Sequence, residues 1–565
     1  MRRRRWAPWL GAALAVAVVV ATVGPTRRTD ADVKAGDGGE AGAITVAGSV
    51  VGDDWSLPAG TQVAANSGFF SERASPARHI DTRSVDVTWR MIEPADGQFR
   101  DDLTGGAEGD PFDSLADQLA APGRFWLRVW ISNVDWAPQW VVDDCDLEPA
   151  GQSAGDHLPI WNDCFWGHAV DLYRHLFIDL GLRDDPRLAL AYVPGAFEWA
   201  EFDLDVPDQA VAAGDLTVPE FTAWFHDMVD DLTGLMGDQV HKLVFTGEDH
   251  PFADFGEADD LLARDAVAAG MGVRTGISEL SNFHLNEVPA YGTAIGADGH
   301  LVTDEGWVLR DPERISAAEH ECFNDCGFQA EHLGYAIRQA NLHALAALRT
   351  NWLYVVPHDS YLDRFAAHWN WVRHSLGQRA DTSADAWVAL RRATDEFWAD
   401  DDQAADAGID WVRRPQVRNL ERWLAQTDAV DGCRSRLGRE RHEGELGSEN
   451  GTAVEGRRTN TAHGQDHLCF RVDDAFLDPE ADADVDVLVT YLDRGRGGFR
   501  ITVPGQNGRL QSPEVTQRDT GKRRAVRFQV TDGRFDGSLP GAIDLRVSRV
   551  RGADVDVQFV RVVER

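Results

Sequence analysis

Short apolar runs alternate with amphipathic stretches between about residues 60 and 425 of this 565-residue chain. Continuous apolar runs are typical of strands covered on both faces, and apolar residues at every third or fourth position are typical of helices. The amphipathic stretches include 169–180, 221–235 and 331–348. Eight alternations of strand and helix predict a (β/α)8 TIM barrel of the α/β class. The strand candidates are 63–70, 85–92, 125–131, 188–193, 242–245, 272–277, 315–321 and 352–356.

From Leu468 onward the pattern changes to alternation of apolar and polar residues. Alternation marks half-buried strands, and several such strands with turns between them predict an all-β sandwich. Before them, 383–391 is expected to begin a final helix on the barrel. The polar, Gly-rich stretch 434–466 is expected to be a loop that enters the second domain. The alternating segments are 485–495, 499–503, 525–530, 543–547 and 555–562.

The N-terminus has the pattern of an exported protein. Arg2 to Arg5 form a positive cluster before an almost wholly apolar stretch that ends at Gly24, which predicts an export signal or a single-pass membrane anchor. The Gly- and Asp-rich stretch after it predicts a flexible tether. We expect the protein to be secreted or to lie on the extracellular face of the membrane. The expected division is 1–24 signal peptide or anchor, 25–58 flexible linker, 59–428 barrel and 429–565 sandwich.

Charge and cysteine content restrict the partners. The formal net charge is -38 and the chain contains three lysines, so no basic patch is available to neutralise the phosphates of a nucleic acid. Six cysteines in an exported chain predict disulfides between sequence neighbours. No Cys-x-x-Cys occurs, so we do not expect a zinc site. We expect no cofactor, and the sequence leaves open whether the second domain holds a calcium ion. The expected pairs are Cys145 with Cys164, Cys322 with Cys326, and Cys433 with Cys469.

Acidic residues follow the fourth and the seventh predicted strands. The fourth is followed by Glu198 and Glu201, and the seventh carries Glu319 and Glu321. Active sites of α/β barrels lie at the carboxyl ends of the strands, and strands four and seven lie on roughly opposite sides of the barrel. The acids of the two strands can therefore face each other across a cleft. For either glutamate after the fourth strand alone, the competing interpretation is a helix cap or a solvated side chain.

Other strand ends carry groups that suit a sugar. Indole faces stack on sugar rings, whereas carboxylates and amides bind hydroxyls. Most of the 20 tryptophans are expected to fill the core, but Trp136 and Trp140 lie in a polar loop and are expected to form subsite walls. Glycoside cleavage needs one protonated and one ionised carboxyl group, which the two strand ends supply. The candidate substrate-binding residues are Arg90, Arg128, Trp136, Trp140, Glu248, Glu279, Asn282, His284 and His358.

Two motifs resemble family 42 β-galactosidase-like barrels. Residues 89–99, WRMIEPADGQF, resemble their Trp-x-x-(Leu/Ile)-Glu-Pro-x-x-Gly-x-(Phe/Tyr) segment, and Pro138-Gln-Trp140 is similar to their Pro-x-Trp. Those enzymes belong to a clan of retaining glycosidases with an acid/base glutamate after strand four and a nucleophile after strand seven. The resemblance implies Glu201, or Glu198, as acid/base and Glu321, or Glu319, as nucleophile of a hydrolase acting on a polysaccharide or oligosaccharide.

One departure from the clan supports a competing function. The clan has Asn directly before its strand-four glutamate, whereas Ala200 precedes Glu201 and Phe197 precedes Glu198. The segment 197–202 instead resembles the Gly-x-Trp-Gly-Glu-Trp element of related, poorly characterised barrel proteins. The alternative is therefore a non-catalytic carbohydrate-binding or cell-surface protein with a degenerate hydrolase barrel. In the second domain, the Val-Thr-Tyr-Leu-Asp-x-Gly segment at 489–495 and the Ile-Asp-Leu-Arg-Val segment at 543–547 resemble jelly-roll modules of secreted glycosidases. Some of those modules bind sugars, and the alternative is a purely structural role.

Overall fold

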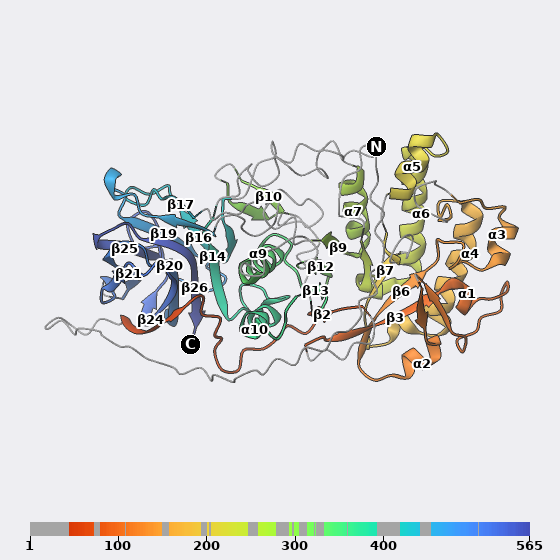
Figure 1. The fold of residues 1–565 in the computed structure, drawn as a ribbon, viewed down its shortest axis with the longest axis horizontal. Helices are drawn as coiled ribbons and strands as arrows, with labels where there is room; N and C mark the ends of the chain where they lie inside the picture. Colours follow the sequence, from red (N-terminus) through yellow and green to blue (C-terminus); the bar gives the residue numbers. More distant parts are fainter. Residues whose placement is uncertain are drawn as a thin grey trace, which may run out of the picture. The chain divides into compact units, whose positions relative to one another are not determined.

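The structure of the protein is a computed structural model (Figure 1). The residues that it describes are 44–72, 79–107, 109–149, 157–193, 200–202, 205–246, 258–277, 293–296, 299–303, 313–320, 323, 333–358, 360–391, 418–440, 454–506 and 508–565.

Eight parallel strands close into a barrel in the order β12, β13, β2, β3, β6, β7, β8, β9. Every predicted run overlaps one barrel strand, so the predicted fold is confirmed. The largest difference at a carboxyl end is in the second strand, because 89–92 turn into the short helix α1 (Trp89–Ile92). The strands are β2 (Gly68–Phe70), β3 (Thr82–Thr88), β6 (Arg124–Trp130), β7 (Leu188–Val193), β8 (Leu243–Phe245), β9 (Gly272–Ile277), β12 (Ser316–His320) and β13 (Trp352–Val355).

The amphipathic stretches form the helices around this barrel. In α6, Thr217 and Glu220 form a capping box in which each side chain accepts a hydrogen bond from the backbone N–H of the other. Phe221, Phe225 and Met228 follow at helical spacing and are fully buried. The helices are α2 (Leu115–Ala120), α3 (Gln139–Asp144), α4 (Asp163–Arg174), α5 (Asp205–Ala213), α6 (Val218–Met236), α7 (Ala258–Ala269), α9 (Leu333–Ala346) and α10 (Ala366–Ser375).

Shorter elements complete the first part of the chain. A π-helix (His175–Asp179) continues α4, and 3-10 helices lie at Leu182–Asp184 and Gly237–Lys242. Two small antiparallel pairs are formed by β4 (Gly105–Ala107) with β5 (Asp110–Phe112) and by β10 (Thr293–Ile295) with β11 (Leu301–Thr303).

The barrel interior is filled by aromatic side chains. Trp126 lies 5.3 Å from the ring of Phe70 and 4.8 Å from that of Tyr192, measured between ring centroids. Because side chains alternate along a strand, the position two residues after Trp126 also points into the barrel. That position is Arg128, which is paired in register with Asp86 of β3. The apolar packing therefore gives way to charged side chains toward the carboxyl ends of the strands.

The second domain is an antiparallel β-sandwich, which confirms the predicted class. Its two halves contain β24 and β21, respectively. A single residue pair, Gly505 of β21 with Gly533 of β24, joins them into a 14-stranded sheet. Val487, Phe528 and Val560 of one half share an apolar core with the other half. A jelly-roll topology stays a prediction. The strands are β1 (Ile44–Val51), β14 (Asp385–Ala389), β15 (Leu420–Arg422), β16 (Leu424–Thr427), β17 (Arg436–Glu440), β18 (Val454–Arg458), β19 (His467–Val472), β20 (Asp482–Leu492), β21 (Arg496–Gly505), β22 (Gly508–Gln511), β23 (Val515–Arg518), β24 (Arg523–Arg534), β25 (Leu545–Gly552) and β26 (Asp556–Glu564).

Three local expectations were wrong. Residues 383–391 contain strand β14 instead of a helix, because pairing with β26 outweighs the helix propensity of its alanines. Residues 44–51 form β1, paired with β24, instead of a flexible linker. Strands β17 and β18 pair with each other in the stretch expected to be a loop, and the 3-10 helix Thr461–His463 follows them. In all three cases a distant or neighbouring strand supplies hydrogen bonds that the local pattern does not reveal.

Two of the predicted disulfides are present. The Cα–Cα distances are 5.6 Å between Cys145 and Cys164 and 5.7 Å between Cys433 and Cys469. The third pair lies outside the described residues and stays a prediction. Within the described ranges, no helix has both the length and the apolar character needed to cross a membrane. The predicted signal or anchor at 1–24 lies outside these ranges.

We predict a bridge between Cys322 and Cys326, directly after the seventh strand. Mass spectrometry of unreduced peptides should show it together with the two described bridges. Because the closed loop is short, this bridge should add little to the free energy of unfolding and should mainly fix the position of Glu321. Free thiols at both positions would contradict the prediction, and the Cys145–Cys164 peptide serves as the internal control.

Candidate active site

A buried arginine joins two glutamates at the carboxyl ends of the barrel strands. Arg274 of β9 is fully buried. Its Nη2 lies 2.6 Å from Oε1 of Glu201, which follows β7, and its Nη1 forms an ion pair with Oε2 of Glu319 on β12. The side chain of Glu201 is 22% exposed and that of Glu319 is 8% exposed. We call these three residues the Glu201–Arg274–Glu319 group.

The backbone around β9 and β12 brings Arg274 close to Glu319. A Cβ atom on Gly272 would lie 2.5 Å from the backbone oxygen of Ile315, so the close approach of the two strands requires glycine there. The strand register then shifts between Ala317 and Glu319. Such an irregularity re-aims the side chains that follow it, and here it lies at the residue that pairs with Arg274.

Glu201 is held on both sides by unusual local structure. Ala200 has a φ of 55° in the left-handed region, which costs about 1 kcal/mol for a residue with a Cβ atom. Its methyl group is buried against Trp130 and Trp136. On the other side, the Phe202 N–H donates to Oγ1 of Thr246, at the end of β8, over 2.6 Å. The strained residue and this hydrogen bond fix the backbone that carries the Glu201 carboxylate.

A second charged group lies beside the first. Nε of Arg128 donates to Oδ1 of Asp86 over 2.6 Å, and its Nη1 donates to Oε1 of Glu72 over 2.5 Å. The Trp130 indole N–H also donates to Asp86, over 3.2 Å. Burial alone would lower the pKa of Arg128, but the two carboxylates outweigh it and raise this pKa above its ordinary value. Arg128 therefore stays charged inside the barrel.

Tyr192 of β7 lies close to both groups. Its ring centroid is 5.2 Å from the guanidinium carbon of Arg274, and the charges of Arg128 and Glu72 also act on its hydroxyl. Burial raises the pKa of Tyr192 far above its ordinary value, so the hydroxyl remains protonated at physiological pH. This buried hydroxyl has no hydrogen-bond partner among the described residues. The charges of the Glu201 and Glu72 carboxylates act on this donor.

The remaining sequence-predicted residues lie in different surroundings. Trp136 is 2% exposed and packs edge to face on Trp130, so its ring contacts protein instead of lining a cleft. Trp140 is half-buried, whereas Arg90 and His358 are exposed. The binding roles of these residues stay predictions. The candidates that lie outside the described residues are Glu198, Glu248, Glu279, Asn282, His284 and Glu321.

The motif at 89–99 has a structural explanation. The buried carboxylate of Glu93 accepts hydrogen bonds from the Trp89 indole N–H and the Gly97 backbone N–H, both over 2.9 Å. The Trp140 indole donates to the carbonyl of Glu93 over 3.1 Å. Burial raises the pKa of Glu93, which these donors oppose. Gly97 has a φ of 64°, which favours glycine. The motif closes the turn after β3.

Sequence reasoning missed Arg274, Tyr192, Asp86 and Glu72. A usable signal was present for two of them. Arg274 and Asp86 are single charges inside apolar strand candidates, and a charge in a strand buried on both faces must find a partner there. Arg128 shows the same pattern and was selected. Tyr192 and Glu72 carried no comparable signal.

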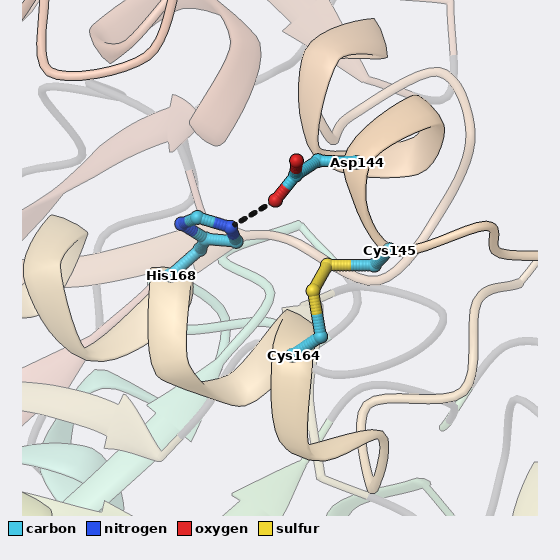
Figure 2. A group of neighbouring side chains, drawn as sticks. All are labelled: Asp144, Cys145, Cys164 and His168. Atoms are coloured by element: carbon cyan, nitrogen blue, oxygen red, sulfur yellow. Dashed lines mark hydrogen bonds and ion pairs between the residues drawn. A yellow bond between two sulfur atoms is a disulfide. The ribbon is translucent and has the colours of Figure 1, made fainter.

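A group of possible metal ligands outside the barrel centre does not form a metal site. Asp144, Cys145, Cys164 and His168 lie together at the junction of α3 and α4 (Figure 2). The two sulfur atoms are bonded to each other, and Nε2 of His168 lies 3.0 Å from Oδ2 of Asp144. The disulfide removes both thiolates as ligands, so the cluster links two helices.

A large cavity lies away from both charged groups. It has a volume of about 1250 Å³ between the chain that precedes α4 and helices α5 and α6, with Trp161 and Trp224 in its wall. The residues that line it include five acids and none of the Glu201–Arg274–Glu319 group.

Comparisons with known proteins identify no family. No family model matches the chain, and no curated protein matches it. It is similar to a solved structure titled "Crystal structure of SpGH29" at 10% sequence identity, over 88% of this chain and 98% of that chain, with a TM-score of 0.21. A TM-score this low supports no argument about this chain. The closed parallel barrel itself defines the class as a TIM-barrel protein with a C-terminal β-sandwich.

We predict that Arg274→Met lowers the free energy of unfolding by about 3–5 kcal/mol, because it leaves two buried carboxylates without their cation. The free energy of unfolding of Arg274→Lys should lie between those of the wild type and Arg274→Met, since one ammonium group keeps the charge but cannot contact both carboxylates as the planar guanidinium does. Urea unfolding followed by tryptophan fluorescence measures both. Arg174→Met, at a side chain that is 54% exposed, is the matched control and should change stability by less than about 0.5 kcal/mol. Wild-type stability in Arg274→Met would contradict the importance of these ion pairs.

Proposed function

We propose that the protein is an extracellular glycoside hydrolase that cleaves a polysaccharide or oligosaccharide by a retaining two-glutamate mechanism. Glu201 is the proposed acid/base, and Glu321 or Glu319 is the proposed nucleophile. The observation that carries the proposal is the position of Arg274, which contacts Glu201 with one terminal nitrogen and Glu319 with the other. Disulfides in two separate parts of the chain suit an oxidising compartment outside the cytoplasm.

The geometry of a guanidinium explains why this contact supports the chemistry. Its nitrogens form a rigid fork, so two carboxylates bound to the two terminal nitrogens are held close together. Retaining glycosidases need a separation of about 5–5.5 Å between their carboxyl groups. Here the carboxylates come from strands four and seven, the two strand ends that the sequence selected.

The proposed reaction has two steps. The ionised nucleophile attacks the anomeric carbon while Glu201 gives its proton to the departing glycosidic oxygen, which breaks the carbon–oxygen bond. Water then attacks the glycosyl-enzyme ester, and Glu201 accepts its proton. Glu201 suits the acid/base role because its side chain is more exposed than that of Glu319 and can exchange protons with solvent. Tyr192 is a candidate positioning residue, because its protonated hydroxyl can donate to a carboxylate or a sugar hydroxyl.

A second candidate is a non-catalytic carbohydrate-binding or cell-surface protein. In this candidate function the ion pairs of Arg274 hold both carboxylates permanently, so that neither attacks a sugar or donates a proton to it. Ala200 in place of the clan asparagine favours the same interpretation. In that case the barrel would bind glycans without cleaving them.

We predict that Glu201→Gln lowers kcat by roughly 10²- to 10⁴-fold, since it removes the proton donor. One of Glu319→Gln and Glu321→Gln should lower kcat at least as strongly, which identifies the nucleophile. The assay is a panel of aryl glycosides and of plant and microbial glycans. Glu480→Gln, at an exposed position of the sandwich, is the matched control. Unchanged kcat in all of Glu198→Gln, Glu201→Gln, Glu319→Gln and Glu321→Gln would rule the assignment out.

We also predict that the first-formed product keeps the anomeric configuration of the substrate, because one guanidinium that contacts both Glu201 and Glu319 leaves little room for a water molecule between their carboxyl groups. Proton NMR recorded early in the reaction distinguishes the two anomers. An inverted product would mean a wider carboxyl pair than proposed. Binding of a glycan without any product would favour the non-catalytic candidate.

A further inference from the structure

A smaller pocket lies apart from the Glu201–Arg274–Glu319 group, where α9 and α10 meet the start of β24 and residues 53–55. Its volume is about 370 Å³, and its wall includes Arg338, Arg364 and Arg523. Among the described residues that line it, Asp53 is the one acid. Arg338 and Arg523 both pair with this one carboxylate, so the two cations outnumber their shared anion, in a protein whose formal net charge is -38.

Arg338 is the central group of this pocket. Its side chain is 4% exposed, and its Nε lies 3.2 Å from Oδ2 of Asp53. The same carboxylate oxygen lies 3.0 Å from Nη2 of Arg523, so two cations share it. Nη2 of Arg338 is buried and has no hydrogen-bond partner among the described residues. A buried donor of a charged group is costly to leave without an acceptor, and an anion in the pocket would supply one.

The other walls are aromatic. The ring of Trp55 is half-buried and lies 4.3 Å from the ring of His368, and Tyr335 and Phe365 also line the pocket. Burial, with a further contribution from Arg338, lowers the pKa of His368 to about 3, so this imidazole is neutral at physiological pH and adds no charge. The pocket therefore has a cationic end and apolar ring faces. This combination suits a ligand that carries an anionic group on a ring.

We propose that this pocket binds a small organic oxyanion, a carboxylate or phosphate carried on a sugar-sized ring, with Arg338 and Arg364 as its donors. The planar fork of a guanidinium matches both oxyanions with two parallel hydrogen bonds, and the aromatic faces hold the ring. The volume lies near the lower end of the range of roughly 300–1,000 Å³ that is common for small-molecule sites. The site does not depend on the proposed hydrolase activity. Its occupant contacts barrel helices and a sandwich strand together, so binding stabilises their contact.

Calorimetric titration of the full chain tests the site, with D-glucuronate, D-glucose 6-phosphate and D-glucose as separate ligands at matched ionic strength. We expect at least one anionic sugar to bind and to raise Tm, while glucose and an equal ionic strength of sodium chloride do neither. The stronger of the two anions tells whether the site is built for a carboxylate or a phosphate. Arg364→Gln should weaken binding at least 10-fold, and Arg338→Met should abolish it.

Exposed Arg174 of α4 provides the matched control, and Arg174→Gln should bind as the wild type does. Arg364 is also exposed, so Arg364→Gln should fold and decides the test if Arg338→Met does not fold. Three results would overturn the proposal. These are binding of neither anionic sugar, equal binding of glucose, and unchanged affinity for the anionic sugar in Arg364→Gln.

Discussion

The pairing of buried guanidinium groups with carboxylates is the constraint on which the centre of the barrel depends. Arg128 and Arg274 are almost completely removed from water, and each is held between two carboxylates from other parts of the barrel wall. A buried charge without a partner destabilises the fold by several kcal/mol. Removing one member of a buried ion pair has the same effect, because it leaves the other charge unpaired. The strands can close only in an arrangement that brings each cation between its anions. The same arrangement gathers reactive groups at one end of the barrel.

Most of the fold could be predicted because the barrel strands lie in mainly apolar runs that alternate with amphipathic stretches. The run at 188–193 matches β7 at both ends, and that at 272–277 matches β9. Strand β14 could not be predicted in the same way. Its Ala-Trp-Val-Ala segment has no local preference strong enough to reveal that β26 lies beside it. Strand β1 is a similar case, because its partner lies at the other end of the chain.

The candidate site was predictable in its acids and not in its cation. Glu201 and Glu319 follow from their place at strand ends, whereas the role of Arg274 depends on a register shift that no local pattern encodes. Trp136 shows the opposite limit. Its loop is polar, yet the ring is buried against Trp130 and Ala200, because the strained turn before Glu201 needs a surface to pack on. An aromatic residue in a polar loop can therefore support the backbone of a site, and the expected role of Trp136 as a subsite wall stays a prediction.

The position of β1 also has a consequence for the order of folding during synthesis. Ile44 pairs with Val530, so the two partners are 486 residues apart in the chain, from 530 minus 44. At about 5–20 residues per second, the ribosome needs roughly 25–100 s to make that interval. The barrel strands are all complete before β24 emerges, and β1 spends this time without its partner. The N-terminal strand therefore waits longer for its partner than any other strand of its sheet, although it is the first of them to leave the ribosome.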